Sequence, residues 1–175
     1  MRTCIAIMAL VFAAAASAAS KQEIDAEVRE TLTQFQKQTS AGHELSQKAA
    51  GMLVFPKVIK AGFGVGGEFG EGALLIHGKT VAYYNIAAAS IGFQVGAQAR
   101  SEIVLFMNDN ALGNFRNSKG WKAGVDGSVA LATLGAGGSI DTETAQKPII
   151  GFIFSNQGLM YNLTFEGSKI SKIAK

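Results

Sequence analysis

The chain has 175 residues, of which 16 are lysine or arginine, 13 are aspartate or glutamate and one is cysteine. The charges nearly balance, which excludes the strongly basic footprint of a dedicated nucleic-acid binder, so we expect no nucleic-acid partner. The cysteine, Cys4, falls in a leader described next, so a mature chain has no thiol for a disulfide, a thiolate nucleophile or a metal ligand. A chain of this length suits one domain with its own hydrophobic core.

Residues 1–19 have the pattern of a secretory signal peptide. Arg2 gives a short positive start, and residues 5–16 are apolar but too short to span a bilayer. Small residues follow and fit the A-x-A rule, so we expect cleavage after Ala18 or Ala19. The pattern looks bacterial, so the mature protein is expected to be periplasmic or secreted, at most peripheral to a membrane. The alternative is a short N-terminal membrane anchor.

Residues 20–42 are predicted to form an N-terminal helix. Ile24, Val28, Leu32 and Phe35 recur at helical spacing and share one face, and Gly42 is a plausible stop. This face packs on the domain or, as a sharper alternative, contacts a membrane. A second short helical piece is expected at residues 43–50, within a domain that covers residues 43–175.

From Gly51 onward the pattern changes to strands separated by glycines. A short inserted helix at residues 109–116 interrupts them, with Asn108 as its N-cap. Closely spaced strands favour antiparallel pairing, because parallel strands need long crossovers. The predicted fold class is α+β, with a strongly curved, mostly antiparallel, glycine-rich sheet or partly closed barrel. Strands are predicted at residues 52–55, 62–67, 72–77, 81–87, 90–97, 103–107, 123–134, 139–142, 148–154 and 159–165.

The run of residues 51–72 is the richest in glycine. Gly62, Gly64 and Gly67 satisfy G-x-G-x-x-G, but a strand-like segment follows where a nucleotide site requires a helix N-terminus. The glycines are better explained if strands bend sharply, bulge or lie against another backbone.

Several ordered blocks resemble the SYLF-domain family. They are AGMLVFPKVIKAGFGVGGEFGEG at residues 50–72, ASIGFQVGAQ at residues 89–98, VLFM at residues 104–107, and the later Gly120-Trp121 and Gly124-Val125-Asp126. The resemblance spans roughly residues 45–165 and implies a lipid-binding domain. Eukaryotic relatives act at membranes through phosphoinositides, and some bind actin. Actin is an unlikely partner in a bacterial periplasm, so membrane or lipid contact is the part that transfers.

Six residues are candidate lipid contacts: Lys57, Lys60, Arg116, Lys119, Trp121 and Lys122. Lysine and arginine can meet lipid phosphates, and a tryptophan beside cations suits the headgroup level of a membrane. The alternatives are solvated surface cations and a core tryptophan.

No pattern for catalysis, a cofactor or a metal stands out, because the two histidines lie far apart and no nucleophile motif is present. Glu68 and Glu71 are expected as exposed turn acids. The main hypothesis is therefore an exported, membrane-associated lipid-binding domain without catalytic activity, with a phospholipid or membrane surface as its partner. The alternatives are a small outer-membrane β-barrel, a protein-interaction or filament-binding module, and a hydrolase that acts on envelope polymers through Glu68, Glu71 and Asp126.

Overall fold

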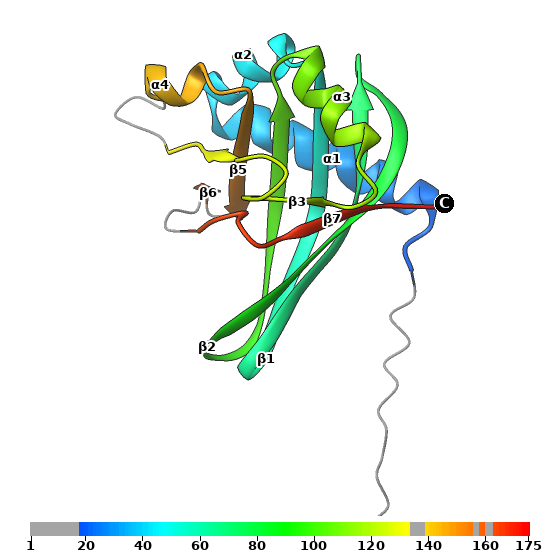
Figure 1. Ribbon diagram of the computed structural model, residues 1–175, viewed down its shortest axis with the longest axis vertical. Helices are drawn as coiled ribbons and strands as arrows, with labels where there is room; N and C mark the ends of the chain where they lie inside the picture. The colour runs from blue at the N-terminus through cyan, green and yellow to red at the C-terminus, as the bar shows by residue number, and fades with distance from the viewer. Residues whose placement is uncertain (1–17, 134–138, 156–157, 160–162) are drawn as a thin grey trace, which may run out of the picture.

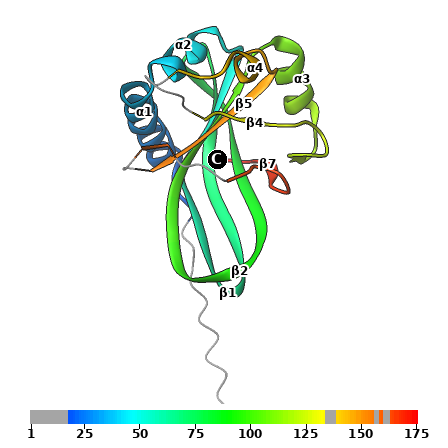
Figure 2. The same ribbon diagram turned by 90° about the vertical axis from the view of Figure 1, so that its left-hand side faces the viewer.

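A computed structural model describes residues 18–133, 139–155, 158–159 and 163–175, without the side chains of residues 63–64, 90–97 and 158–159. Figures 1 and 2 show a curled sheet, with α1 and α2 on one side of it and a long arm that leaves the body. The elements in chain order are α1 (Lys21–Gln38), α2 (Ser40–Lys48), β1 (Gly51–Ile76), β2 (Lys79–Phe106), α3 (Asp109–Asn117), β3 (Trp121–Lys122), β4 (Ala130–Leu131), α4 (Thr142–Ala145), β5 (Ile149–Ser155), β6 (Gly158–Leu159) and β7 (Lys169–Ile173).

Helix α1 begins at a capping box. The Ser20 hydroxyl accepts a hydrogen bond from the Glu23 backbone N–H at 3.2 Å, and the Glu23 carboxylate accepts one from the Ser20 N–H at 2.6 Å. Ile24, Val28 and Phe35 are buried, so the predicted apolar face packs on the sheet.

The predicted single helix of residues 20–42 is two helices. Helix α1 ends at Gln38, and Thr39 both ends it and caps α2, where its hydroxyl accepts from the Gly42 N–H at 2.7 Å. The expected stop at Gly42 is wrong, because this glycine lies inside α2 against the Phe35 ring, where a side chain would collide.

The sheet is built on one long antiparallel ribbon. Strands β1 and β2 pair along their whole length, from Gly51 opposite Phe106 to Ile76 opposite Lys79. The two ends of β2 carry the rest of the sheet, since one pairs with β5 and the other with β7. Among the described strands only β4 and β5 pair in parallel. The predicted α+β class with a curved, mostly antiparallel sheet is confirmed.

Glycines let β1 fold back on itself. A Cβ placed on Gly62 would collide with the backbone of Val65 and Gly66, and one on Gly72 would collide with the Val54 carbonyl group. The two halves of the strand therefore touch backbone to backbone, which only residues without a side chain allow. This confirms the predicted sharp bends and close backbone approach.

The expected turns between short strands in residues 51–106 are wrong except at residues 77–78. His77 and Gly78, both with positive φ, form the only described break between β1 and β2. The glycines keep extended pairing through the bend, so three predicted strands merge into β1 and three into β2.

Further predicted strands are shorter or absent. The described residues 123–133 contain only β4 as a strand, residues 139–142 lead into α4 with Asp141 as its N-cap, and residues 163–165 are not in a strand. Residue 159 of that predicted strand is in β6, and residues 160–162 lie outside the described residues. The predicted N-cap Asn108 is confirmed, since its side chain accepts from the Ala111 N–H at 2.8 Å. The predicted strand at residues 148–154 is confirmed as β5.

Two hydrophobic cores lie on opposite faces of the sheet. The inner one contains Phe55, Phe106, Phe115 and Trp121 and is covered by α3. The outer one contains Phe35 and lies under α1 and α2. The body of the sheet is therefore packed on both faces. The bend of the ribbon extends beyond α1 and α2 (Figure 2).

Candidate functional site

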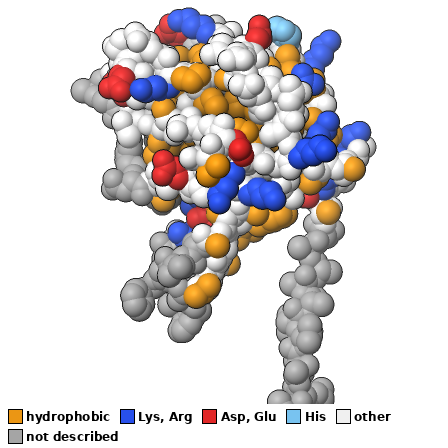
Figure 3. All heavy atoms as spheres, viewed as in Figure 1, with side chains coloured by type: hydrophobic (Ala, Val, Ile, Leu, Met, Phe, Trp, Pro, Cys, Tyr) orange, Lys and Arg blue, Asp and Glu red, His pale blue; other side chains and the backbone are white. Residues whose placement is uncertain are grey.

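The arm is the bent middle of the β1–β2 ribbon, around Gly62 to Gly66. Residues 61–67 and 88–99, which form its tip, include no charged residue. Of the described apolar side chains, Ile59 is 40% exposed, Val65 is 74% exposed and Phe69 is 49% exposed. Figure 3 shows hydrophobic side chains on this projection below the body. An uncharged, apolar projection is unusual on a protein surface and marks a place that contacts something other than water.

A network of ion pairs closes the base of the arm. Arg100 donates from Nε to Glu102 at 2.7 Å and from Nη2 to Glu68 at 2.5 Å, and Lys60 lies 3.5 Å from Glu68. The Arg100 and Glu102 side chains are 8% and 2% exposed, so the charges are almost fully removed from water. Buried charges persist only when they are paired, and here two cations face two carboxylates.

Glu102 is the most constrained member of this network. Its Oε2 atom is buried and has no hydrogen-bond partner among the residues that the structure describes. Burial raises the pKa of Glu102 above its usual value, while Arg100 opposes that shift. Arg100 and Glu102 lie on the same strand face as the core residues Val104 and Phe106, because residues two apart share a face.

Sequence reasoning missed Arg100 and Glu102. The sequence pattern that could have indicated them is a pair of opposite charges at positions 100 and 102, which alternate in the same two-residue period as the apolar residues 104 and 106. Glu68 and Glu71 were predicted as exposed turn acids, which is wrong. Both are in β1, with side chains 13% and 16% exposed, and both form ion pairs.

A groove of about 390 Å³ lies beside the arm base, between α1 and the sheet. Glu27 and Glu30 line it from α1, and Lys57 and Arg100 line it from the ribbon. The groove therefore carries both signs of charge. Lys57 is exposed, and it forms no ion pair with the described residues.

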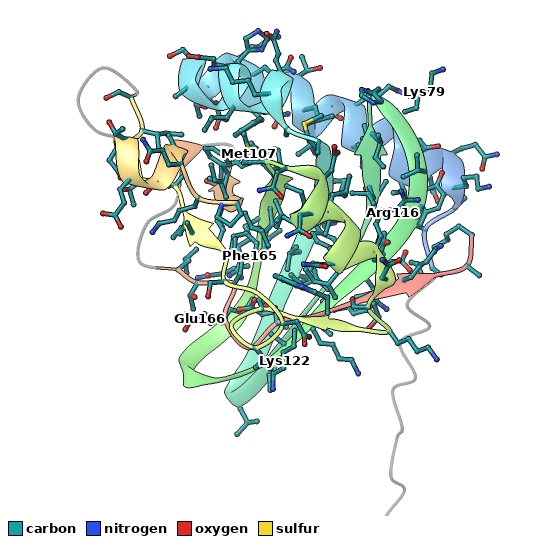
Figure 4. All side chains as sticks on the ribbon, turned by 45° about the horizontal axis from the view of Figure 1, so that its top comes forward. Lys79, Met107, Arg116, Lys122, Phe165 and Glu166 are labelled. Carbon is teal, nitrogen blue, oxygen red and sulfur yellow. The ribbon has the colours of Figure 1, made fainter. Side chains whose placement is uncertain are left out.

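A set of exposed cations, called the basic cluster, is distributed over α3, β3 and β7 and the connection between α3 and β3. We define it as Arg116, Lys119, Lys122, Lys169 and Lys172, all exposed and none ion-paired within the described part of the chain. Lys122 and Lys169 are direct cross-strand partners, so their side chains share a face. Like charges placed opposite each other repel, and an anionic partner would relieve that repulsion. Figure 4 shows Arg116 and Lys122 from α3 and β3, and Figure 3 shows Lys and Arg side chains gathered above the arm.

The structure thus divides the six predicted lipid contacts into two sets. Arg116, Lys119 and Lys122 lie at the end of α3, in the connection to β3 and in β3, and Lys57 and Lys60 lie in β1 at the arm base. Lys60 is tied to Glu68.

Trp121 lies in the inner core. It is 2% exposed and its ring centroid is 5.8 Å from that of Phe115. A headgroup contact would require this indole to leave the core, so the structure favours the alternative of a core tryptophan. The other lipid contacts stay predictions.

The remaining acids have structural roles. Asp126 accepts a hydrogen bond from the Lys122 backbone N–H at 2.6 Å and closes a tight turn.

No group of three potential metal-binding side chains comes together within the described ranges. Among the helices that the structure describes, none has the length and hydropathy to cross a membrane.

Comparison with known families identifies the chain. Residues 87–174 match the family model Ysc84, described as Las17-binding protein actin regulator. The chain belongs to the Ysc84 (SYLF) family. The match begins within β2 and includes the whole basic cluster and β7, so the resemblance in residues 89–98 and beyond is confirmed. A comparison with curated proteins gave no match.

The family description concerns binding and regulation, and it names no reaction. This favours a binding module over the envelope hydrolase. The acids proposed for such a hydrolase, Glu68, Glu71 and Asp126, are all held by ion pairs or a backbone hydrogen bond.

Proposed function

We propose that this protein is an exported, non-catalytic module that binds phospholipid membranes by inserting the tip of its β1–β2 arm. The observation that carries the proposal is the uncharged tip, where Val65 is exposed, with Phe69 exposed two residues beyond it, on a part of the chain that projects from the body. Moving apolar surface from water into the membrane is favourable by roughly 25 cal/mol per Å².

The length of the arm suits insertion into one leaflet. From the paired residues Val58 and Arg100 to Gly64 at the bend, six residues of strand span about 20 Å. One leaflet of the hydrocarbon core is about 15 Å thick. The tip can therefore pass the headgroups while the ion-paired Arg100 and Glu68 stay at the level of the interface.

The basic cluster supplies the electrostatic part of the attraction. Juxtamembrane cations contribute about 1 kcal/mol each near an anionic surface. Figure 3 shows Lys and Arg side chains on the body next to the arm, and cations at this place would meet lipid phosphates when the tip is inserted. Insertion and charge attraction then act on the same face of the molecule. Peripheral membrane proteins commonly combine these two contributions, burial of apolar surface and attraction to anionic lipids.

We infer export from the leader, and the compartment determines which molecules the mature protein can meet. In a bacterial periplasm the accessible partner is phospholipid, and we propose neither nucleic acid nor actin as a ligand. The family description names an actin regulator, but that concerns the family and not this chain.

Vesicle co-sedimentation tests the proposal. The mature chain should sediment with vesicles of phosphatidylglycerol and phosphatidylcholine, and Val65→Glu should reduce binding strongly because it places a charge in the inserted tip. Val81→Glu is the matched control, since Val81 is 45% exposed and lies near the far turn of the ribbon. Equal binding by both variants, or no sedimentation of the unmodified chain, would refute insertion of the arm.

A further inference from the structure

The two ends of the described chain meet at one carboxylate on the sheet. The Ala19 backbone N–H donates to Glu71 Oε2 at 3.1 Å, and Lys175 Nζ donates to Glu71 Oε1 at 2.9 Å. Lys175 also donates to the Ala19 carbonyl oxygen at 2.8 Å. Figure 1 shows the start of α1 beside the C-terminus. Three segments far apart in the sequence therefore share one three-way contact, which we call the terminal clasp.

The clasp is shielded from solvent. The Glu71 and Lys175 side chains are 16% and 10% exposed, and Ala19 packs against the outer hydrophobic core. Glu71 lies on the outer strand face, in phase with Ala73 and Leu75 of that core. A carboxylate this shielded makes stronger electrostatic contacts than an exposed one, because water screens it less.

We propose that the Ala18–Ala19 bond is the processing site and that the new N-terminus of the mature chain is the third charged member of the clasp. A membrane-bound leader peptidase would hydrolyse this bond with one water, leaving a carboxylate on Ala18 and an amine on Ala19. That amine takes up a proton at neutral pH and becomes an ammonium beside Glu71 Oε2. The inference rests on the proposed export and adds the site of cleavage and the fate of the new terminus.

The clasp distinguishes a mature chain that begins at Ala19 from one that begins at Ser20. Ala16 and Ala18 satisfy the small-residue rule for cleavage after Ala18. Cleavage one residue later would place the ammonium on Ser20, whose nitrogen lies 2.6 Å from the Glu23 carboxylate, and would remove the Ala19 N–H that donates to Glu71. It would also remove the carbonyl group that accepts from Lys175.

Processing at this bond has a structural consequence. In the uncleaved chain Ala19 offers Glu71 only a neutral amide, whereas the mature chain offers it a full charge. The contact among α1, β1 and Lys175 would then be more stable in the cleaved chain than in a chain that still carries residues before Ala19. The clasp thus couples removal of the leader to the stability of the mature domain.

Two measurements test this inference. Mass spectrometry of the full-length gene product recovered from the periplasm should give an N-terminus at Ala19. A mature product that begins at Ser20 or elsewhere would overturn the inference while leaving export intact. A product that retains residues 1–18 would overturn the proposed export as well.

Thermal unfolding tests the ammonium itself. We compare a chain that starts at Ala19 with one in which Gly-Ser precedes Ala19, each with and without Glu71→Gln. The extension should lower Tm by about 2–4 °C when Glu71 is present and have no effect in the Glu71→Gln background. Glu143→Gln, which removes an exposed ion pair with Lys147, is the control in which the effect of the extension should persist. An equal effect of the extension in all three backgrounds, or none in any, would overturn the role of the new terminus.

Discussion

Gly62 and Gly66 lie against each other at the bend of β1, so close that neither can carry a side chain without moving the other's backbone. This contact shapes the arm, because it lets one continuous strand reverse direction while keeping its pairing with β2. The tip of the arm carries no charge and projects from the body. Its surface is therefore suited to contact with lipid.

The glycine contacts should be intolerant of even a methyl group. Gly72→Ala should destabilise the fold by about 1–3 kcal/mol, because its Cβ would collide with the Val54 carbonyl group and the Phe55 ring. Gly67→Ala in the same strand is the control, since its Cβ would meet only the Ala88 carbonyl oxygen at an ordinary 3.4 Å. Urea unfolding measures both, and equal losses would show that close approach is not what the glycines provide.

The buried ion pairs should be sensitive to loss of the shared cation. Arg100→Met should cost about 3–5 kcal/mol at pH 7, because it leaves Glu102 buried without its partner and Glu68 with only Lys60. The same measurement on Lys48→Met, which removes an exposed pair with Glu44, should show a change below about 0.5 kcal/mol. Similar losses would mean that the network at the arm base contributes no more than a surface pair.

Glu102 should make stability fall as pH rises. Its folded-state pKa is raised above the usual value of 4.5, so the folded protein binds the proton more tightly than the unfolded chain. Stability from this group is therefore fully present below about pH 4.5 and decreases up to the raised pKa. Glu102→Gln removes this contribution, so its stability relative to the unmodified protein should rise from pH 4 to pH 7. A relative stability that is flat or falls over this range in chemical unfolding would contradict the assignment.

The basic cluster should govern affinity for anionic membranes. Replacing Arg116, Lys119 and Lys122 with glutamine should weaken binding to phosphatidylglycerol vesicles by about fivefold per cation, and added salt should reduce the difference. The matched triple variant replaces Arg29, Lys37 and Lys79, which are exposed on α1 and beside the far turn of the ribbon (Figure 4 labels Lys79). Comparable losses in both triple variants would indicate a diffuse charge effect and no defined binding face.

Much of the fold could be predicted because local signals decide it. The spacing from Ile24 to Phe35 gives the face of α1, and Asn108 gives the start of α3. The continuity of β1 could not be predicted, because a glycine run fits a turn or a strand equally well in sequence. Only packing of one half of the strand on the other decides between them.

The candidate site shows the same division. Local composition located the cations Arg116, Lys119 and Lys122, and the structure adds that Lys169 lies beside Lys122 through the pairing of β3 and β7. That pairing brings together residues far apart in sequence, so no local pattern reports it. Burial of Trp121 under α3 likewise depends on tertiary packing.

Depth-dependent fluorescence quenching tests the central claim most directly. Val65→Trp places a reporter at the arm tip, while the native Trp121 is buried in the body and serves as the internal reference. On vesicles whose lipids carry bromine along the acyl chains, the Val65→Trp protein should be strongly quenched and the unmodified protein should not. Binding of both proteins to the vesicles with no additional quenching from Val65→Trp would contradict insertion of the arm.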